Sequence, residues 1–94
     1  MSHPSYEEFK TQTLAQGFDE VLQRQWAPDT VLGTHSHSFS VSARVVQGEM
    51  WLTVGENTRH LQPGDTFTLA RDVPHAERYG HDGATFWVAR RNTA

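Results

Sequence analysis

Three histidines in this chain of 94 residues have the spacing of metal ligands. His35 and His37 are separated by one residue, and His75 follows Val73-Pro74. On an extended strand, side chains at i and i+2 point to the same face with their bases about 6.5–7 Å apart, so both imidazoles can approach one ion. A histidine pair needs at least one further ligand from elsewhere in the fold. We therefore predict a metal site formed by His35, His37 and His75.

A hydrogen-bonded core is the alternative interpretation of these histidines. A single buried histidine is usually satisfied by hydrogen bonds, but two on one face are harder to satisfy, because an uncompensated buried polar group costs on the order of 1–3 kcal/mol. Burial also lowers the pKa of histidine and favours the neutral, ligating form. The pattern favours a metal site over a metal-free structural barrel.

Glu77 and Tyr79 lie two and four residues after His75, so they share its face if that strand is straight. Glu77 is then a candidate metal ligand or general base, and Tyr79 a candidate hydrogen-bond donor to a substrate. If the strand bends after His75, both are rim residues instead. His60 and His81 lie beside turn residues and are expected at the surface.

The stretch from His35 to Val45 alternates between two kinds of residue, which predicts one strand with the histidines on its inner face. The inner set is His35, His37, Phe39, Val41, Ala43 and Val45, and the other set is four serines with Arg44. A shift of one residue would turn the serines and the arginine inward, so the register is strongly specified.

The remaining elements are a short helix and several strands. Ser5 to Gln16 is expected to be helical, with Ser5 as its cap, Gly17 at its end, and Tyr6, Phe9, Thr13 and Leu14 on one side. Turn residues then recur about every eight to ten positions, at 27–29, Gly48, 55–57, 63–65, 72–74 and 80–83. Such spacing favours an all-β sandwich or barrel. We expect an N-terminal helical segment at 1–17 and one barrel domain at 18–94.

The amino-acid composition limits the types of metal ligand and of binding partner that the chain can have. The chain has no cysteine, which excludes disulfides and thiolate ligands and leaves histidine and carboxylate. Eight basic and eleven acidic residues give a net charge of -3, and the arginines are scattered, so no nucleic-acid partner is expected. The adjacent Arg90 and Arg91 are interpreted as a solvated terminus. Because no targeting segment or apolar run of ~18 residues is visible, we expect no membrane partner and a cytoplasmic location.

The chain resembles the cupin superfamily. His35-Ser36-His37 and Gly48 match the first cupin motif, and Gly64 and His75 match the second with the intervening count preserved. Val41 stands at the first motif's glutamate, Asp29 at an upstream glycine, and Ala70, Asp72 and Tyr79 at the second motif's proline, glycine and asparagine. The resemblance covers roughly residues 18–91. It implies a double-stranded β-helix, a jelly-roll barrel with the histidines at its mouth, and a homodimer.

Val41 cannot supply the carboxylate that usually completes three-histidine, one-glutamate cupin sites, and Glu77 is the candidate replacement. The resemblance therefore implies either a three-histidine centre for a divalent transition metal (Fe, Ni, Zn, Mn, Co or Cu) or a site that has lost its metal. Some related dioxygenases use three-histidine iron. The predicted function is a small-molecule dioxygenase or a Lewis-acid or isomerase-type enzyme; the alternative is a non-catalytic small-molecule-binding or sensor cupin.

Overall fold

The chain folds into one helix and six strands in a computed structural model that describes residues 5–92. The elements are α1 (Tyr6–Ala15), β1 (Glu20–Trp26), β2 (Val31–His35), β3 (Ser40–Val54), β4 (Asn57–Leu61), β5 (Thr66–Leu69) and β6 (His75–Arg91). The predicted all-β barrel with a short N-terminal helix is confirmed. The outer ends of the predicted ranges 1–17 and 18–94 lie outside the described residues.

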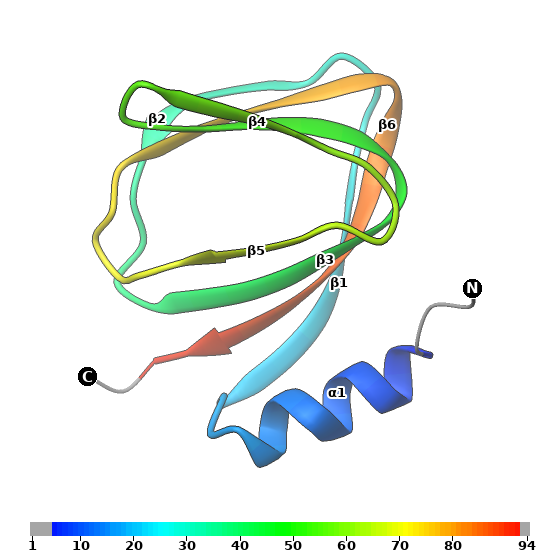
Figure 1. Cartoon of the computed structure of the whole chain (residues 1–94), viewed down its shortest axis with the longest axis vertical. Helices are drawn as coiled ribbons and strands as arrows, with labels where there is room; N and C mark the ends of the chain where they lie inside the picture. Colours follow the sequence, from blue (N-terminus) through cyan, green and yellow to red (C-terminus); the bar gives the residue numbers. More distant parts are fainter. Residues whose placement is uncertain (1–4, 93–94) are drawn as a thin grey trace.

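The long strands β3 and β6 each run through both layers of the barrel (Figure 1). In one layer, residues 84–91 of β6 lie between β1 and residues 40–48 of β3, and β5 pairs with β3 on its other side. In the other layer, residues 75–79 of β6 lie between β2 and residues 50–53 of β3, and β4 completes the edge. Every pairing is antiparallel, so the strand orders are β1-β6-β3-β5 and β2-β6-β3-β4.

Glycines form the corners where β3 and β6 pass from one layer to the other. The predicted turns at Gly48 and at 80–83 were wrong, because both positions lie inside continuous strands. Gly48 and Gly83 have φ values of +74° and +72°, and the β3–β6 register shifts between Gly48 and Met50. A Cβ on Gly48 would lie 2.1 Å from the Gly83 carbonyl oxygen, and a Cβ on Gly83 would lie 2.3 Å from that of Trp26. Only glycine allows the backbones to approach this closely.

The barrel interior contains the side chains that the alternating pattern predicted. Val41, Ala43 and Val45 are buried in one cluster, together with Met50, Leu52, Leu61, Phe67, Leu69, Tyr79, Ala84, Phe86 and Val88. The single strand predicted from His35 to Val45 was wrong, however. β2 ends at His35 and β3 begins at Ser40, so residues 36–39 form a connection between strands.

Helix α1 covers the outside of the layer that contains β1 (Figure 1). Ser5 caps it as predicted, in a capping box with Glu8, and Phe9 packs on Trp87 with their ring centroids 5.7 Å apart. Leu14 was expected on the buried side but is 41% exposed, because the helix buries only its Phe9–Thr13 side. Over residues 5–92, no helix has the length and apolar character needed to cross a membrane.

Candidate metal centre and cavity

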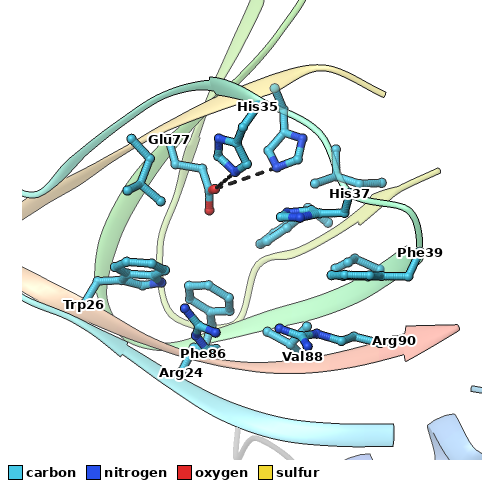
Figure 2. Close-up of a pocket in the computed structure, with 14 residues that line it drawn as sticks. Arg24, Trp26, His35, His37, Phe39, Glu77, Phe86, Val88 and Arg90 are labelled. Atoms are coloured by element: carbon cyan, nitrogen blue, oxygen red, sulfur yellow. Dashed lines mark ion pairs between the residues drawn. The ribbon is translucent and has the colours of Figure 1, made fainter. Parts of the chain in front are cut away.

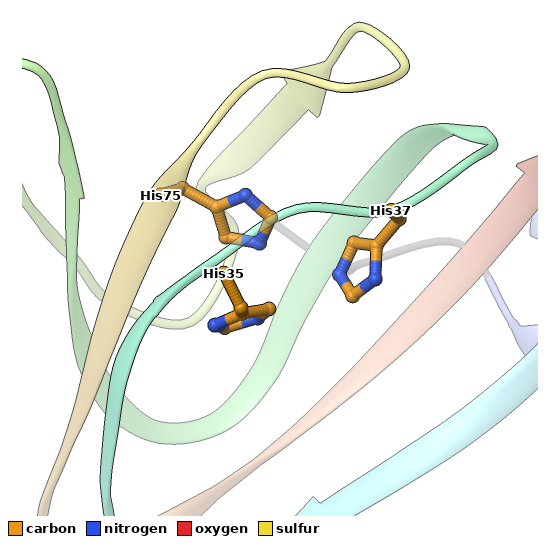
Figure 3. A group of neighbouring side chains, drawn as sticks. All are labelled: His35, His37 and His75. Atoms are coloured by element: carbon orange, nitrogen blue, oxygen red, sulfur yellow. The ribbon is translucent and has the colours of Figure 1, made fainter.

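The three predicted ligands lie together at one end of the barrel (Figure 3). One nitrogen from each of His35, His37 and His75 lies within 4.8 Å of the other two. His35 and His75 are cross-strand partners in the β2–β6 pair, which brings their ring centroids to 4.4 Å. The His37 ring lies 5.1 Å from that of His35 and 5.0 Å from that of His75. Three chain segments therefore supply one ligand each.

His37 is positioned by the connection between β2 and β3 rather than by a strand. The Asp72 backbone N–H donates to the His37 carbonyl oxygen over 2.7 Å, and Arg71 Nη2 donates to the Ser38 carbonyl oxygen over 2.8 Å. The His37 ring stacks on Phe39 with a centroid distance of 4.8 Å. The turn before β6 thus fixes the loop that carries the second histidine.

Backbone carbonyls determine which nitrogen of two histidines can bind a metal. His35 Nδ1 lies 2.7 Å from the Gly33 carbonyl oxygen, and His75 Nδ1 lies 3.0 Å from that of Val73. A carbonyl oxygen only accepts hydrogen bonds, so each Nδ1 carries the proton and each Nε2 keeps its lone pair in the neutral ring. This outer hydrogen bond is the usual support of a metal-binding histidine.

Glu77 extends from β6 toward both of those lone pairs (Figure 2). Its Oε2 lies 3.2 Å from His35 Nε2 and 3.7 Å from His75 Nε2, and its side chain is 9% exposed. A carboxylate oxygen and two imidazole lone pairs repel one another unless a proton or a metal ion lies among them. Three imidazoles and one carboxylate are donors that divalent transition metals accept, so these residues fit such an ion.

Tyr79 contacts Glu77 at Oε1, the carboxylate oxygen that does not face the histidines. The fully buried Tyr79 hydroxyl donates to Glu77 Oε1 over 2.6 Å, and its ring stacks between Trp26 and Phe86 at centroid distances of 5.2 and 6.3 Å. Burial raises the pKa of the Tyr79 phenol, and its hydrogen bond to Glu77 raises it further. Tyr79 therefore holds the carboxylate as a neutral donor. Its predicted hydrogen bond to a substrate stays a prediction, since the phenol is not among the residues lining the cavity.

Burial lowers the pKa of His37, and the neighbouring His75 and His35 lower it further. The negative charge of the Glu77 carboxylate raises the pKa of His37 and so opposes this effect, while the positive charge of Arg90 adds to it. The net result favours the neutral imidazole, which is the form that binds a metal.

A cavity of about 130 Å³ lies between the two layers (Figure 2). The histidines and Glu77 form one wall, and Arg24 and Arg90 extend from the opposite layer. The side chains between these two walls are apolar: Trp26, Leu32, Phe39, Val41, Phe67, Leu69, Phe86 and Val88. The cavity thus has polar groups at two ends and an apolar middle.

Sequence reasoning missed the residues of the second wall. Arg90 was interpreted as part of a solvated terminus, but it lines the cavity with its guanidinium 4.6 Å from the Phe39 ring centroid. The alternation Phe86, Val88, Arg90 was the available signal, because Phe86 and Val88 face the interior. The same period places Arg24 and Trp26 on the inner face of β1.

The other histidines of the described chain lie outside the cavity, as predicted. The side chain of His60 is 41% exposed, pairs with Glu49 and stacks on Trp51. That of His81 is 92% exposed at the β6 corner.

Comparison with known proteins gives a family and a fold. A family model described as "Cupin domain" matches residues 24–89, which include all three histidines. A solved structure from a study of DMSP lyases superposes with a TM-score of 0.70 and 26% identity, covering 76% of this chain and 37% of that one. The structure of KdgF from Halomonas sp. superposes with a TM-score of 0.65 and 20% identity, covering 78% and 68% of the two chains. The family match and the similarity to solved cupin structures confirm the double-stranded β-helix.

One curated relative is an uncharacterized HTH-type transcriptional regulator from Haemophilus influenzae. It is 46% identical over 35 residues, which is 37% of this chain and 12% of the relative. The chain therefore matches only a small part of that regulator.

Proposed function

Because this chain belongs to the cupin domain family, we propose that it is a metal-dependent enzyme acting on a small molecule inside the barrel. In this proposal His35, His37 and His75 hold one divalent transition metal ion, and Glu77 faces the same position. The observation that carries the proposal is the shared orientation of two Nε2 lone pairs toward the Glu77 carboxylate, with both Nδ1 protons on backbone carbonyls.

The metal remains to be identified among Fe, Ni, Zn, Mn, Co and Cu, since imidazole suits most of them. Three neutral imidazoles add no negative charge to the ion, so the bound ion would supply Lewis acidity toward an oxygen or nitrogen of the substrate. Val41, at the usual glutamate position, is buried among apolar side chains and contributes no ligand.

Glu77 gives the proposed site a base. With its Oε1 bound by the Tyr79 hydroxyl, Oε2 is the atom directed at the histidine cluster. In a substrate whose carbonyl is polarised, Glu77 Oε2 takes a proton from the adjacent carbon. In an isomerisation, Glu77 returns this proton to a different atom of the substrate. In an elimination, the electron pair left on the carbon forms a C=C bond while a leaving group departs from the next carbon with its bonding electrons. Proton abstraction of this kind fits isomerase and lyase reactions, and one solved neighbour comes from a study of lyases.

Elemental analysis of untagged protein tests the metal site. We expect close to one equivalent of a transition metal in the wild-type protein and loss of most of it in His35→Ala, His37→Ala and His75→Ala. His81→Ala is the matched control, because His81 is 92% exposed and lies away from the cavity. Metal-free wild-type protein that also fails to bind added Ni²⁺, Zn²⁺ or Fe²⁺ would contradict the proposal.

Turnover assays then separate the two reaction classes. With the metal-loaded protein, lyase or isomerase turnover without oxygen uptake supports Glu77 as the base, and Glu77→Gln should abolish it. Oxygen uptake by the iron-loaded protein would instead support the dioxygenase predicted from three-histidine iron sites.

A sensor function is the second candidate, favoured by the match to part of an HTH-type regulator. In that case the barrel binds its ligand without turnover and acts through a further protein or domain. A ligand retained in native mass spectrometry, unaffected by chelators and unchanged after incubation, would support the sensor over the enzyme.

Homodimer formation is also a prediction. A dimer would have twice the 10.7 kDa mass of the chain. Size-exclusion chromatography with light scattering measures that mass directly, and a value near that of one chain would contradict the prediction.

A further inference from the structure

We infer that the molecule bound in the cavity is a small organic carboxylate, with its carboxylate bound by Arg24 on the wall opposite the histidines. The inference rests on the proposed metal centre for the other end of the molecule, where an oxygen or nitrogen of the ligand would meet the ion. Arg24 lines the cavity from β1, a strand that carries none of the proposed ligands.

Arg24 has no acidic partner among residues 5–92. It makes no hydrogen bond or ion pair within that range, and its guanidinium carbon lies 4.9 Å from the Trp26 ring centroid. It lies on β1 opposite Phe86, so its neighbours on the strand face and across the strand pair are the aromatic residues Trp26 and Phe86. A guanidinium offers parallel N–H donors that match the two oxygens of a carboxylate.

Arg90 adds to the positive charge of this wall. Its Nη1 lies 3.4 Å from Glu20 Oε1, a long ion pair at the edge of the barrel, and its buried Nε has no hydrogen-bond partner in the part of the chain that the structure describes. Arg90 also contacts the Phe39 ring, which keeps its guanidinium over the cavity. Arg90, which is paired with Glu20, therefore contributes positive charge near a bound anion, while Arg24 supplies the hydrogen bonds to it.

The charge of the cavity lining favours an anionic ligand. The residues that line the cavity include two guanidinium groups and one carboxylate, Glu77, and Glu20, which pairs with Arg90, lies outside the lining. A bound divalent ion adds two further positive charges. Charge complementarity of this kind attracts an anion to the cavity and disfavours cationic molecules.

The size and the apolar middle of the cavity limit the rest of the ligand. Its volume of about 130 Å³ is below the ~300–1,000 Å³ of pockets that take drug-sized molecules. Phe67, Phe86 and Val88 lie between the two polar walls, so a short hydrocarbon segment is expected there. The inferred ligand class is a short acid with one further oxygen or nitrogen donor away from the carboxylate.

Calorimetric titration with a matched acid and amide tests this inference. The probes are 3-hydroxybutanoate and 3-hydroxybutanamide, which differ in charge but hardly in shape, added to nickel-loaded protein. Only the acid can make a charge-assisted hydrogen bond with Arg24, so we expect it to bind at least about tenfold more tightly than the amide. Arg24→Gln should remove that preference and leave the nickel content unchanged. Arg24→Lys, which keeps the charge, should retain part of it.

Arg59→Gln is the control for a change in total charge, because Arg59 is exposed on β4, and it should bind the acid as the wild type does. The same titration with His75→Ala tests the Arg24 carboxylate site separately from the proposed metal site. If the acid preference persists there while metal is lost, the arginine site acts independently of the metal. Equal affinity for acid and amide in the wild type, no binding of either at millimolar concentrations, or an unchanged preference in Arg24→Gln would overturn the inference.

Discussion

The two oxygens of Glu77 have different partners. Oε1 accepts the Tyr79 proton, and Oε2 faces the unprotonated nitrogens of His35 and His75. The first contact is complete within the chain, and the second requires a proton or a metal ion between the carboxylate and the rings. This asymmetry leads to predictions with opposite signs for the metal-loaded and metal-free protein.

Glu77→Gln should weaken metal binding but leave the metal-free protein as stable as the wild type or more stable. The amide nitrogen can donate to an imidazole lone pair, which removes the repulsion present without a cation. Loss of a carboxylate in or next to a metal site typically lowers affinity by about 10–100-fold. Chelator competition and urea denaturation of the metal-free protein measure the two effects.

Glu49→Gln is the matched control for that substitution, because Glu49 also pairs with a histidine but at the surface. It should leave the metal affinity unchanged. An equal loss of affinity in both variants, or none in Glu77→Gln, would show that Glu77 has no role at the metal.

Tyr79→Phe should lower the free energy of unfolding by about 2 kcal/mol, because it removes a buried hydrogen bond to a carboxylate. Tyr6→Phe is a useful comparison, since the Tyr6 hydroxyl donates to the Val21 carbonyl in a partly buried position over 3.1 Å. A neutral hydrogen bond of that kind should contribute about 1 kcal/mol. Equal losses in urea denaturation of the two variants would contradict a special role for the Tyr79–Glu77 contact.

Two aspartates explain why the turns form although the glycines of the family motifs are absent from these positions. Asp29 and Asp72 stand where glycines are expected, and both adopt left-handed backbone conformations, with φ values of 59° and 63°. Aspartate is one of the few residues other than glycine that tolerate this region. The sequence could therefore predict the turn positions, and Asp72 keeps its backbone donor to the His37 carbonyl.

At the scale of strands, the alternation of residue types predicted which side chains face the barrel interior better than it predicted where each strand begins and ends. Val41, Ala43 and Val45 lie inside as expected, yet the strand assumed to begin at His35 begins at Ser40. The face of His37 was still correct, because Arg71 and Asp72 hold the connection through contacts distant in sequence. Periodicity reports which residues are buried, and such long-range hydrogen bonds leave no local signal.

The corners of β3 and β6 give a prediction at this scale. Gly83→Ala should lower the free energy of unfolding by at least about 2 kcal/mol, because it combines a strained positive φ with a clash against backbone. Gly55→Ala separates the two causes, since Gly55 has a φ of +61° but nothing within 4 Å of an added Cβ. It should lose only about 1 kcal/mol. Thermal or urea denaturation that finds equal losses would assign the effect to strain alone.

For the whole molecule, the proposed metal joins β2, the connection after it and β6 at one end of the barrel. Binding to the folded chain stabilises it by mass action, by about 2.7 kcal/mol when the free ion is at 100 times its dissociation constant. In a domain of this size we expect the metal to raise the melting temperature by several degrees per kcal/mol. Removal of the metal by a chelator should reverse the shift, with His75→Ala unresponsive to metal.

The same stabilisation should decline as the pH falls below about 6.5, because the unfolded histidines then take up protons that the metal-bound histidines cannot. The lowered pKa of His37 acts in the same direction, since the folded state keeps this ring neutral to a lower pH than the unfolded state does. Melting temperatures of the metal-loaded protein between pH 8 and pH 5 measure the trend, with His81→Ala expected to follow the wild type. A pH-independent metal effect would exclude imidazole ligands.

Strand β6 carries His75 and Glu77 before its corner and Phe86, Val88 and Arg90 after it. Both ends of the cavity are thus attached to one covalently continuous segment, and the separation between them depends on how the backbone turns at residues 80–83 rather than on surface loops. Lengthening or shortening that corner would shift the chain length of acceptable ligands while leaving the reactive groups in place. A family built on this strand could diversify its ligands through a few backbone positions that never touch them.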